Sequence, residues 1–209
     1  MKKLFLVLGV TGMLYASSCV SNPEGEKAAT TEATEVATAT AGNQLNVNIA
    51  DSKVDWTGRK VSATHHGDIK IKSGSLTVDG DQLTGGKIVI DMHSMNNLDQ
   101  QGEWKGKLEG HLKSEDFFNT AQFPDATLEI TKVTGKGVGT VEVAANLTIK
   151  DVTKNVTFKA NVTEATDKTF KANTDFNIKR FDWGITYPGK ADDLISEEIN
   201  FKVNLVANS

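Results

Sequence analysis

HLKSEDFF, residues 111–118, is the stretch that decides the fold, together with Phe123 and Pro124 just after it. It carries a serine, two acids and two adjacent phenylalanines in a region with helical character. The sequence on both sides alternates as β-strands do. A single helical insertion in a β-rich chain needs a structural reason. The insertion is explained if it closes one end of a β-barrel around an apolar cavity.

Helical spacing continues on the N-terminal side of this stretch. Trp104, Leu108 and Leu112 lie at positions i, i+4 and i+8, as on one face of a helix. Three glycines lower helix propensity there, namely Gly102, Gly106 and Gly110. The sequence therefore predicts short helical pieces near residues 101–119 rather than one rod. We expect Ser114 to act as an N-cap and the two phenylalanines to point inward.

Residues 43–209 are otherwise dominated by alternation of apolar and polar residues, which is typical of half-buried strands. The longest such run consists of Val141, Val143, Ala145, Leu147 and Ile149. Apolar residues on one face only favour an all-β fold with antiparallel strands in one domain. From the residues alone, a barrel and a two-sheet sandwich both satisfy this pattern.

The N-terminus has the composition of an export signal over residues 1–18. Lys2 and Lys3 precede an apolar run that is shorter than the ~20 residues needed to span a bilayer. Small residues then lead to Cys19, the single cysteine of the chain, which has no partner for an internal disulfide. This arrangement resembles a bacterial lipobox and predicts a lipid anchor on Cys19. An ordinary secretory signal is the alternative.

Residues 19–42 have a different composition from the rest of the chain. The segment is rich in Ala, Thr and Glu, and it has no aromatic residue. Because it offers so little apolar surface to bury, we expect a disordered tether between the lipidated cysteine and the domain. The whole chain carries a formal net charge of −4 and no basic cluster with interleaved aromatics. Nucleic acid is therefore not an expected partner.

Three blocks of the domain together resemble a known family. They are HLKSEDFF with Phe123 and Pro124, LTIKDVTKNV at residues 147–156, and IKRFDWGI at residues 178–185. In this order and spacing they resemble the YceI-like family of lipocalin-like, polyisoprenoid-binding exported proteins. The resemblance extends from about Leu45 to Ala207. One departure is that Leu108 and Glu109 stand where many members carry an Arg-Asp pair.

The resemblance implies a lipocalin-like antiparallel barrel of about eight strands with an apolar lumen. It also implies a long isoprenoid chain as ligand, such as the tail of a quinone or a polyprenyl lipid. The apolar and aromatic residues could equally form a filled core, and the resemblance favours the hollow barrel. The expected ligand-binding residues are Trp56, Ile69, Ile71, Ile88, Ile90, Leu108, Leu112, Phe117, Phe118, Phe158, Phe176, Ile178 and Trp183. The expected head-group rim consists of His65, His66, Arg180 and Tyr187.

Catalytic and metal chemistry are not indicated by the sequence. The serines lie outside a Gly-x-Ser-x-Gly elbow, and residues 43–209 contain no cysteine. His65 and His66 are adjacent, so on a strand they point to opposite faces and make a poor joint metal site. We therefore expect no catalytic residue, no metal and no cofactor. A paired acid and base facing the lumen would instead support an enzyme acting on a bound lipid.

The leading hypothesis is non-enzymatic binding, transport or storage of an amphiphilic isoprenoid lipid in the bacterial cell envelope. The lipid anchor would hold the protein on a membrane, with a periplasmic or outer-membrane location. Exposed strand edges or the barrel mouth could support a homodimer. The alternative is an envelope interaction or stress-response protein with a packed barrel and no lipid ligand.

Overall fold

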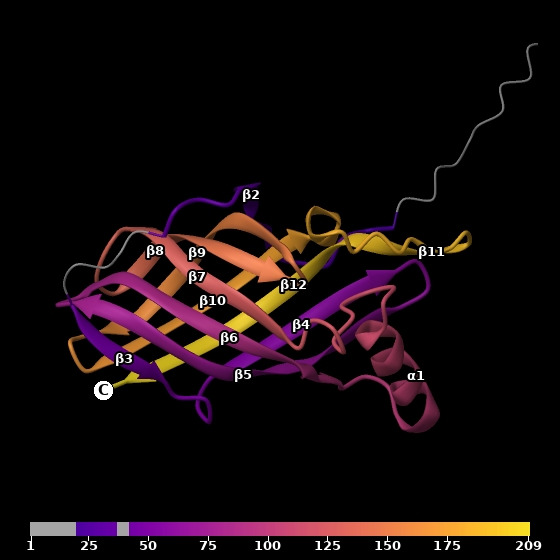
Figure 1. Ribbon diagram of the computed structural model, residues 1–209, viewed down its shortest axis with the longest axis horizontal. Coiled ribbons are helices and arrows are strands. Elements are labelled where there is room, and N and C mark those ends of the chain that lie inside the picture. The colour runs from indigo at the N-terminus through magenta and orange to yellow at the C-terminus, as the bar shows by residue number, and fades with distance from the viewer. Residues whose placement is uncertain (1–19, 37–41) are drawn as a thin grey trace, which may run out of the picture.

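The computed structural model describes residues 20–36 and 42–209, and it shows a barrel with one external helix (Figure 1). The predicted signal peptide, Cys19 and residues 37–41 lie outside the described residues. The barrel is formed by the strands β4 (Lys53–Lys60), β5 (Thr64–Asp79), β6 (Gln82–Asn97), β7 (Asp125–Thr134), β8 (Gly139–Ile149), β9 (Val152–Ala165), β10 (Thr169–Lys179) and β12 (Asp193–Asn208), and the short strand β3 (Asn43–Val47) adds to its wall. The remaining elements are β1 (Glu26–Lys27), β2 (Ala29–Glu32), α1 (Gly102–Lys113), a 3-10 helix (Arg180–Trp183) and β11 (Gly189–Lys190).

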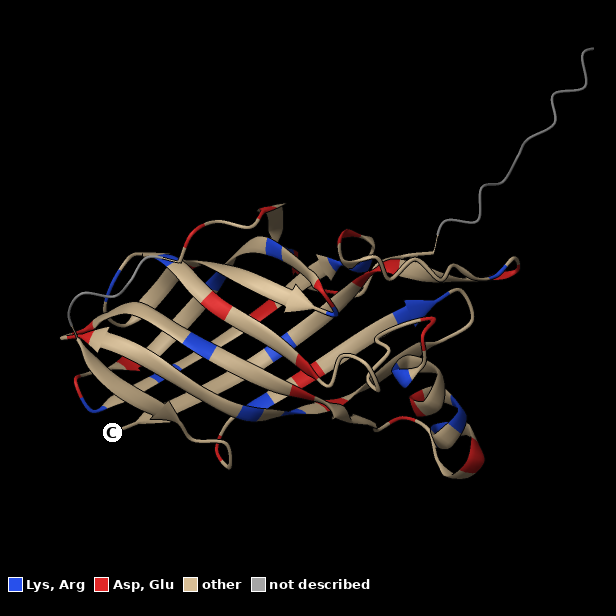
Figure 2. Cartoon of the chain, in the orientation of Figure 1, with Lys and Arg blue, Asp and Glu red and all other residues tan. Residues whose placement is uncertain are grey.

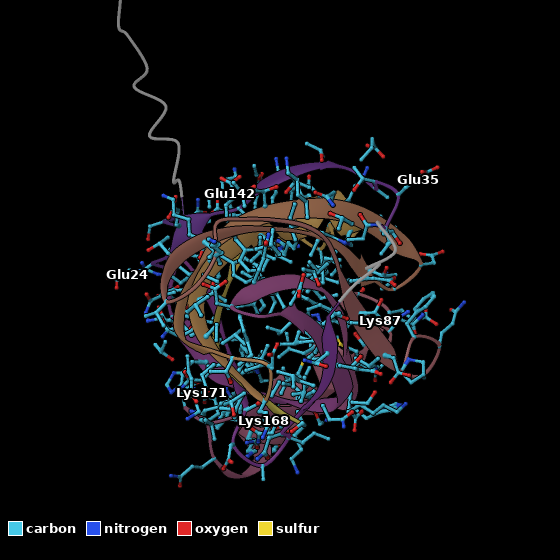
Figure 3. All side chains as sticks on the ribbon, turned by 90° about the vertical axis from the view of Figure 1, so that its left-hand side faces the viewer. Glu24, Glu35, Lys87, Glu142, Lys168 and Lys171 are labelled. Carbon is cyan, nitrogen blue, oxygen red and sulfur yellow. The ribbon has the colours of Figure 1, made fainter. Side chains whose placement is uncertain are left out.

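Eight antiparallel strands close the barrel in the order β4-β5-β6-β7-β8-β9-β10-β12, with β12 pairing back onto β4. Strand β3 lies between the same two neighbours as β4, because it pairs with β5 on one side and with the end of β12 on the other. Seen end-on, the strands form a ring (Figure 3). The predicted all-β barrel of about eight strands is confirmed, and closure excludes the sandwich.

Alternation along each strand explains which side chains fill the barrel. Along β8, Val141, Val143 and Ala145 are buried, whereas the alternate residues Thr140 and Glu142 are exposed. Figure 2 shows that acidic and basic residues are mixed along the strands, and the charged side chains labelled in Figure 3 point away from the ring. The inward positions therefore carry the apolar set that the sequence pattern predicts.

The two ends of the barrel differ in packing. Leu45, Val78 and Ala207 are completely buried at the end that lies away from α1, and Phe170 is 2% exposed there. These side chains fill that end as a dense core. The opposite end lies beside α1 and β11 (Figure 1), so the space inside the barrel opens toward those elements.

Helix α1 corrects two expectations about the insertion. It is one continuous helix of 12 residues, although short pieces were predicted. A Cβ added at Gly102, Gly106 or Gly110 would meet nothing within 4 Å, so the glycines lie on open surface, and the ion pair between Lys107 and Glu103 supports the helix at i,i+4. Ser114 ends the helix rather than starting one, since its hydroxyl donates to the His111 carbonyl at 2.8 Å.

The predicted disordered tether is wrong for residues 20–36. Strand β1 pairs in parallel with β10, and β2 pairs antiparallel with β9, so this segment runs along the outer wall of the barrel (Figure 1). The expectation considered only how much apolar surface the segment could bury. Backbone pairing with free strand edges orders it instead.

Candidate functional site

The barrel encloses an apolar cavity of about 450 Å³. Apolar side chains from β4 to β10 and from β12 form its wall, so no single strand builds the site. Residues of the wall include Val54, Leu76, Met92, Met95, Ala126, Leu128, Ile130, Val143, Leu147, Ala160, Ile199, Phe201, Val203 and Leu205. A cavity of this size and lining is suited to an apolar ligand.

Most residues predicted to bind the ligand lie on this wall. Those that line the cavity are Trp56, Ile69, Ile71, Ile88, Ile90, Leu108, Leu112, Phe117, Phe118, Phe158 and Phe176. Ile178 and Trp183 do not, although each is only 1% exposed. The chain leaves β10 after Lys179, and the 3-10 helix carries Trp183 to β8, where its indole N–H donates to the Leu147 carbonyl at 3.0 Å. These two residues, predicted to bind the ligand, therefore pack outside the cavity lining.

The turn after α1 covers part of the open end. Phe117 and Phe118 are buried and line the cavity, as expected from their position in HLKSEDFF. The Phe118 N–H donates to the Leu112 carbonyl, which folds the turn back onto the end of the helix. Trp104 is 68% exposed and takes no part in the cavity. Closure therefore depends on the turn that follows α1 together with Leu108 and Leu112 on the inner side of the helix.

His65 is held at the mouth of the cavity by a half-buried acid that the sequence did not reveal. Its Nδ1 lies 2.8 Å from Oδ2 of Asp99, and His65 lines the cavity. Burial opposes the charge of Asp99, but hydrogen bonds from the Gln100 side chain, the His66 N–H, His65 and Asn97 outweigh it and lower the pKa of Asp99 from 3.8. The side chain of His66, also predicted at the rim, is 56% exposed and lies outside the cavity lining.

Arg180 was predicted at the rim and lies deeper than a rim residue. It is 1% exposed and lines the cavity. Its guanidinium donates to the carbonyls of Ser196, Ile185 and Ile195 at 2.8, 2.6 and 3.2 Å. Burial lowers the pKa of Arg180 to about 10, which still leaves it charged at neutral pH. Arg180 therefore ties the 3-10 helix to β12 and also places a positive charge beside the cavity.

Other polar residues at the mouth come from separate turns, which is why the sequence did not reveal them as a group. Lys60 and Asp193 form an ion pair of 2.6 Å. Hydrogen bonds from Lys60 and from the Ser62 N–H lower the pKa of Asp193 to about 2. His111 contacts the ring of Tyr187, the remaining predicted rim residue, edge-on at 4.8 Å between centroids. Both groups line the cavity, so its charged side chains gather at this one end.

Replacing Asp99 by Asn is expected to lower the free energy of unfolding by about 1–2 kcal/mol at pH 7, because His65 loses a charged partner. The folded-state pKa of Asp99 lies below 3.8, so its contribution is present above about pH 4 and is lost as the pH falls through the folded value. The difference in the free energy of unfolding between the wild type and Asp99→Asn should therefore narrow below about pH 4. Urea unfolding of both proteins from pH 3 to 7 measures this stability difference. Asp116→Asn, at the exposed pair with His111, is the control and should change little.

Within residues 20–36 and 42–209, no three His, Cys, Asp or Glu side chains group as metal ligands would. No helix in that part of the chain is both long enough and apolar enough to cross a membrane.

Comparison with known proteins places this geometry in a family. Residues 45–207 match the YceI-like domain. The chain belongs to the YceI-like family. A curated relative, the UPF0312 protein of Shewanella denitrificans, is 32% identical over 177 residues, which cover 77% of this chain and 87% of that protein. The UPF0312 protein of Pseudomonas fluorescens SBW25 is 29% identical, with 71% and 79% covered.

Solved structures share the fold of this YceI-like protein. BcnA of Burkholderia cenocepacia superposes with a TM-score of 0.66 at 22% identity, covering 78% of this chain and 99% of BcnA. A polyisoprenoid binding domain from Saccharophagus degradans superposes with a TM-score of 0.60 at 17% identity, covering 81% and 99%. At these identities the likeness establishes the fold, and the resemblance stated from the three sequence blocks is confirmed by the family match.

Proposed function

We propose that this YceI-like protein binds one amphiphilic isoprenoid lipid without chemical conversion and so carries or stores it in the cell envelope. The observation that carries this proposal is the distribution of polarity in the cavity. Its walls are mainly apolar over the length of the barrel, and its charged side chains and aromatic polar groups, including His65, Arg180 and Tyr187, gather at one end, whereas Asn173 and Thr174 are the polar lining residues further along β10. An apolar chain inside and a polar head group at the mouth match that distribution.

Two further points support this assignment. A structural neighbour from Saccharophagus degradans is described as a polyisoprenoid binding domain. The cavity of about 450 Å³ also speaks against a packed barrel that acts only through its outer surface. The candidate ligands are isoprenoid quinones and polyprenyl lipids, whose tails gain ~25 cal/mol for each Å² of apolar surface removed from water.

The direct test is native mass spectrometry, with solvent extraction, of the full chain purified gently from its own membrane. We expect a co-purifying isoprenoid lipid at close to one molecule per chain. If the protein is recovered without lipid and also takes up no added quinone or polyprenol from vesicles, the proposal fails. The packed-barrel interaction protein would then be the better assignment.

We also propose that Cys19 carries a lipid anchor, which rests on the export signal and the lipobox-like residues before it. Cys19→Ser is then expected to move the protein from the membrane fraction to the soluble fraction or to leave its signal uncleaved. Intact-mass measurement of the mature wild-type protein should show the added acyl groups. Recovery of an unmodified thiol on Cys19 in the mature chain would contradict the anchor.

A further inference from the structure

Strands β9 and β10 separate along the barrel wall. They pair directly over only four residue pairs, from Phe170–Ala165 to Asn173–Asn161. Their other neighbours, β8 and β12, each pair with them over eleven residues. Beyond Asn161 and Asn173 the backbones of the two strands no longer pair, and the Thr174 hydroxyl, which donates to the Lys159 carbonyl at 2.6 Å, is the hydrogen bond that still joins them there. We call this stretch, between residues 154–159 of β9 and 174–179 of β10, the seam.

The N-terminal segment bridges the seam from outside. Ala29 to Glu32 pair with Thr157 to Lys154 of β9, and Glu26 and Lys27 pair with Phe176 and Asn177 of β10. Figure 1 shows the segment running on the outer surface from the end near β11 toward β2. Residues 22–34, which we call the strap, therefore complete the wall where β9 and β10 do not.

Side chains of the barrel receive the strap through specific polar contacts. Asn177 donates to the Pro23 carbonyl at 2.9 Å, and Ser196 donates to Oδ1 of Asn22 at 2.8 Å. At the other end, Asn146 exchanges two hydrogen bonds with the backbone of Thr34. Beneath the strap, Asn155, Asn177 and Asn200 are at most 5% exposed, although they lie on the outer side of the barrel. The strap thus occupies a built groove.

The strap has few apolar contacts. Within residues 22–34, only Pro23 and Ala28 are buried, and the other positions are exposed or half-buried. Two ion pairs on its edge, Glu26–Lys159 at 2.8 Å and Glu32–Lys154 at 2.6 Å, involve acids whose side chains are mostly exposed. A third ion pair, Lys27–Glu198 at 3.3 Å, reaches a buried acid. A segment held mainly by backbone pairing and polar contacts, with little buried apolar surface, opens at lower free energy than the apolar barrel core. It can therefore leave the groove while the barrel stays folded.

One aromatic pair separates the strap from the lipid cavity. Phe158 on β9 and Phe176 on β10 stack at 4.3 Å between centroids, with 7° between their planes. Both line the large cavity and also an outer pocket of about 170 Å³, whose other walls include Glu26, Lys27 and Ala29 of the strap. Once the strap has moved, rotation of this pair would connect the cavity with the outside.

We infer that the seam is the lateral entrance of the lipid and that the strap is its removable cover. This inference rests on the proposed function. The strap begins at Asn22, which contacts Ser196 at the mouth end and is three residues from Cys19. At ~3.6 Å per residue, a lipid anchor on Cys19 would lie within ~11 Å of Asn22. The membrane that holds the anchor would then be close to the seam, so a tail could pass sideways between β9 and β10.

A disulfide that holds the strap in its groove tests this inference. Ala29 and Thr157 are opposite each other in the β2–β9 pairing and both line the outer pocket. In a full chain with Cys19→Ser, the double variant A29C/T157C can form a disulfide across this pair. Transfer of a tetraprenyl benzoquinone from phosphatidylcholine vesicles is followed through quenching of tryptophan fluorescence, since Trp56 lines the cavity. K132C/A144C, across β7 and β8 and outside both pockets, is the matched control.

We expect the oxidised lock to slow uptake about tenfold or more, with reduction restoring the rate and the final amount bound unchanged. The control disulfide should leave the rate unaltered. As a second variant, E26K/E32K places like charges opposite Lys159 and Lys154 and should speed uptake. Equal rates in the locked and reduced protein would overturn the lateral entrance while leaving lipid binding intact. No uptake in either state would overturn the proposed function and this inference together.

Discussion

Ala126→Trp is expected to weaken binding of the isoprenoid lipid by about 100-fold, which corresponds to about 2.7 kcal/mol. Ala126 is 5% exposed on β7 and lines the cavity. An indole at this position would project into the space that the lipid tail needs. Because it fills a void rather than a packed region, the free energy of unfolding should change little or increase.

Thr127→Trp is the control for this variant. Thr127 is the next residue of the same strand, and it points to the outer face because side chains alternate along β7. The Thr127→Trp variant should bind the lipid with the affinity of the wild type. Titration with the tetraprenyl benzoquinone measures both variants, and urea unfolding verifies that both are folded. Wild-type affinity in a folded Ala126→Trp protein would mean that the tail does not occupy the barrel.

The barrel and its apolar lining could be predicted because both follow from local order in the sequence. Strand residues alternate with period two, so residues such as Val141 and Val143 are assigned to the inside without knowledge of their neighbours. Phe117 and Phe118 could be placed for a similar reason, since two adjacent phenylalanines in a polar turn have only the interior to occupy. Three sequence blocks in a fixed order then favoured the hollow barrel over the sandwich.

The strap could not be predicted, because its partners are strand edges that exist only after the barrel has formed. Asn177 illustrates this. In the sequence it is a polar residue in a strand, next to the apolar Phe176 and Ile178, which indicates a solvent-facing position. In the structure it is 1% exposed because Pro23 lies over it. Several asparagines in strands, where this residue is disfavoured, were the one available signal.

The mouth shows a second limit of sequence reasoning. Asp99 fixes His65, but 34 residues separate them and no motif links the two. Helical spacing grouped Trp104 with Leu108 and Leu112, yet only the two leucines line the cavity. Periodicity gives the direction of a side chain relative to its own element. Where that element lies on the barrel depends on packing between residues that are distant in sequence.

Arg180→Lys is expected to lower the free energy of unfolding by about 3 kcal/mol, although the charge is conserved. Arg180 donates from Nε and from both terminal nitrogens to three different carbonyls, and it is almost completely buried. One ammonium group cannot reach all three acceptors in that geometry. Carbonyls of Ser196, Ile185 or Ile195 would then be buried without a donor, which costs more than the average hydrogen bond contributes.

Arg59→Lys is the matched substitution at the same end of the barrel. Arg59 donates one hydrogen bond of 3.4 Å, to the Asn22 carbonyl, so its replacement should change stability by less than about 0.5 kcal/mol. Urea unfolding of both variants at pH 7 provides the comparison. Equal stability of Arg180→Lys and wild type would show that the three carbonyl contacts do not hold the 3-10 helix on β12. Arg180 would then act mainly on the bound head group, and Arg180→Lys would have to reduce lipid affinity instead.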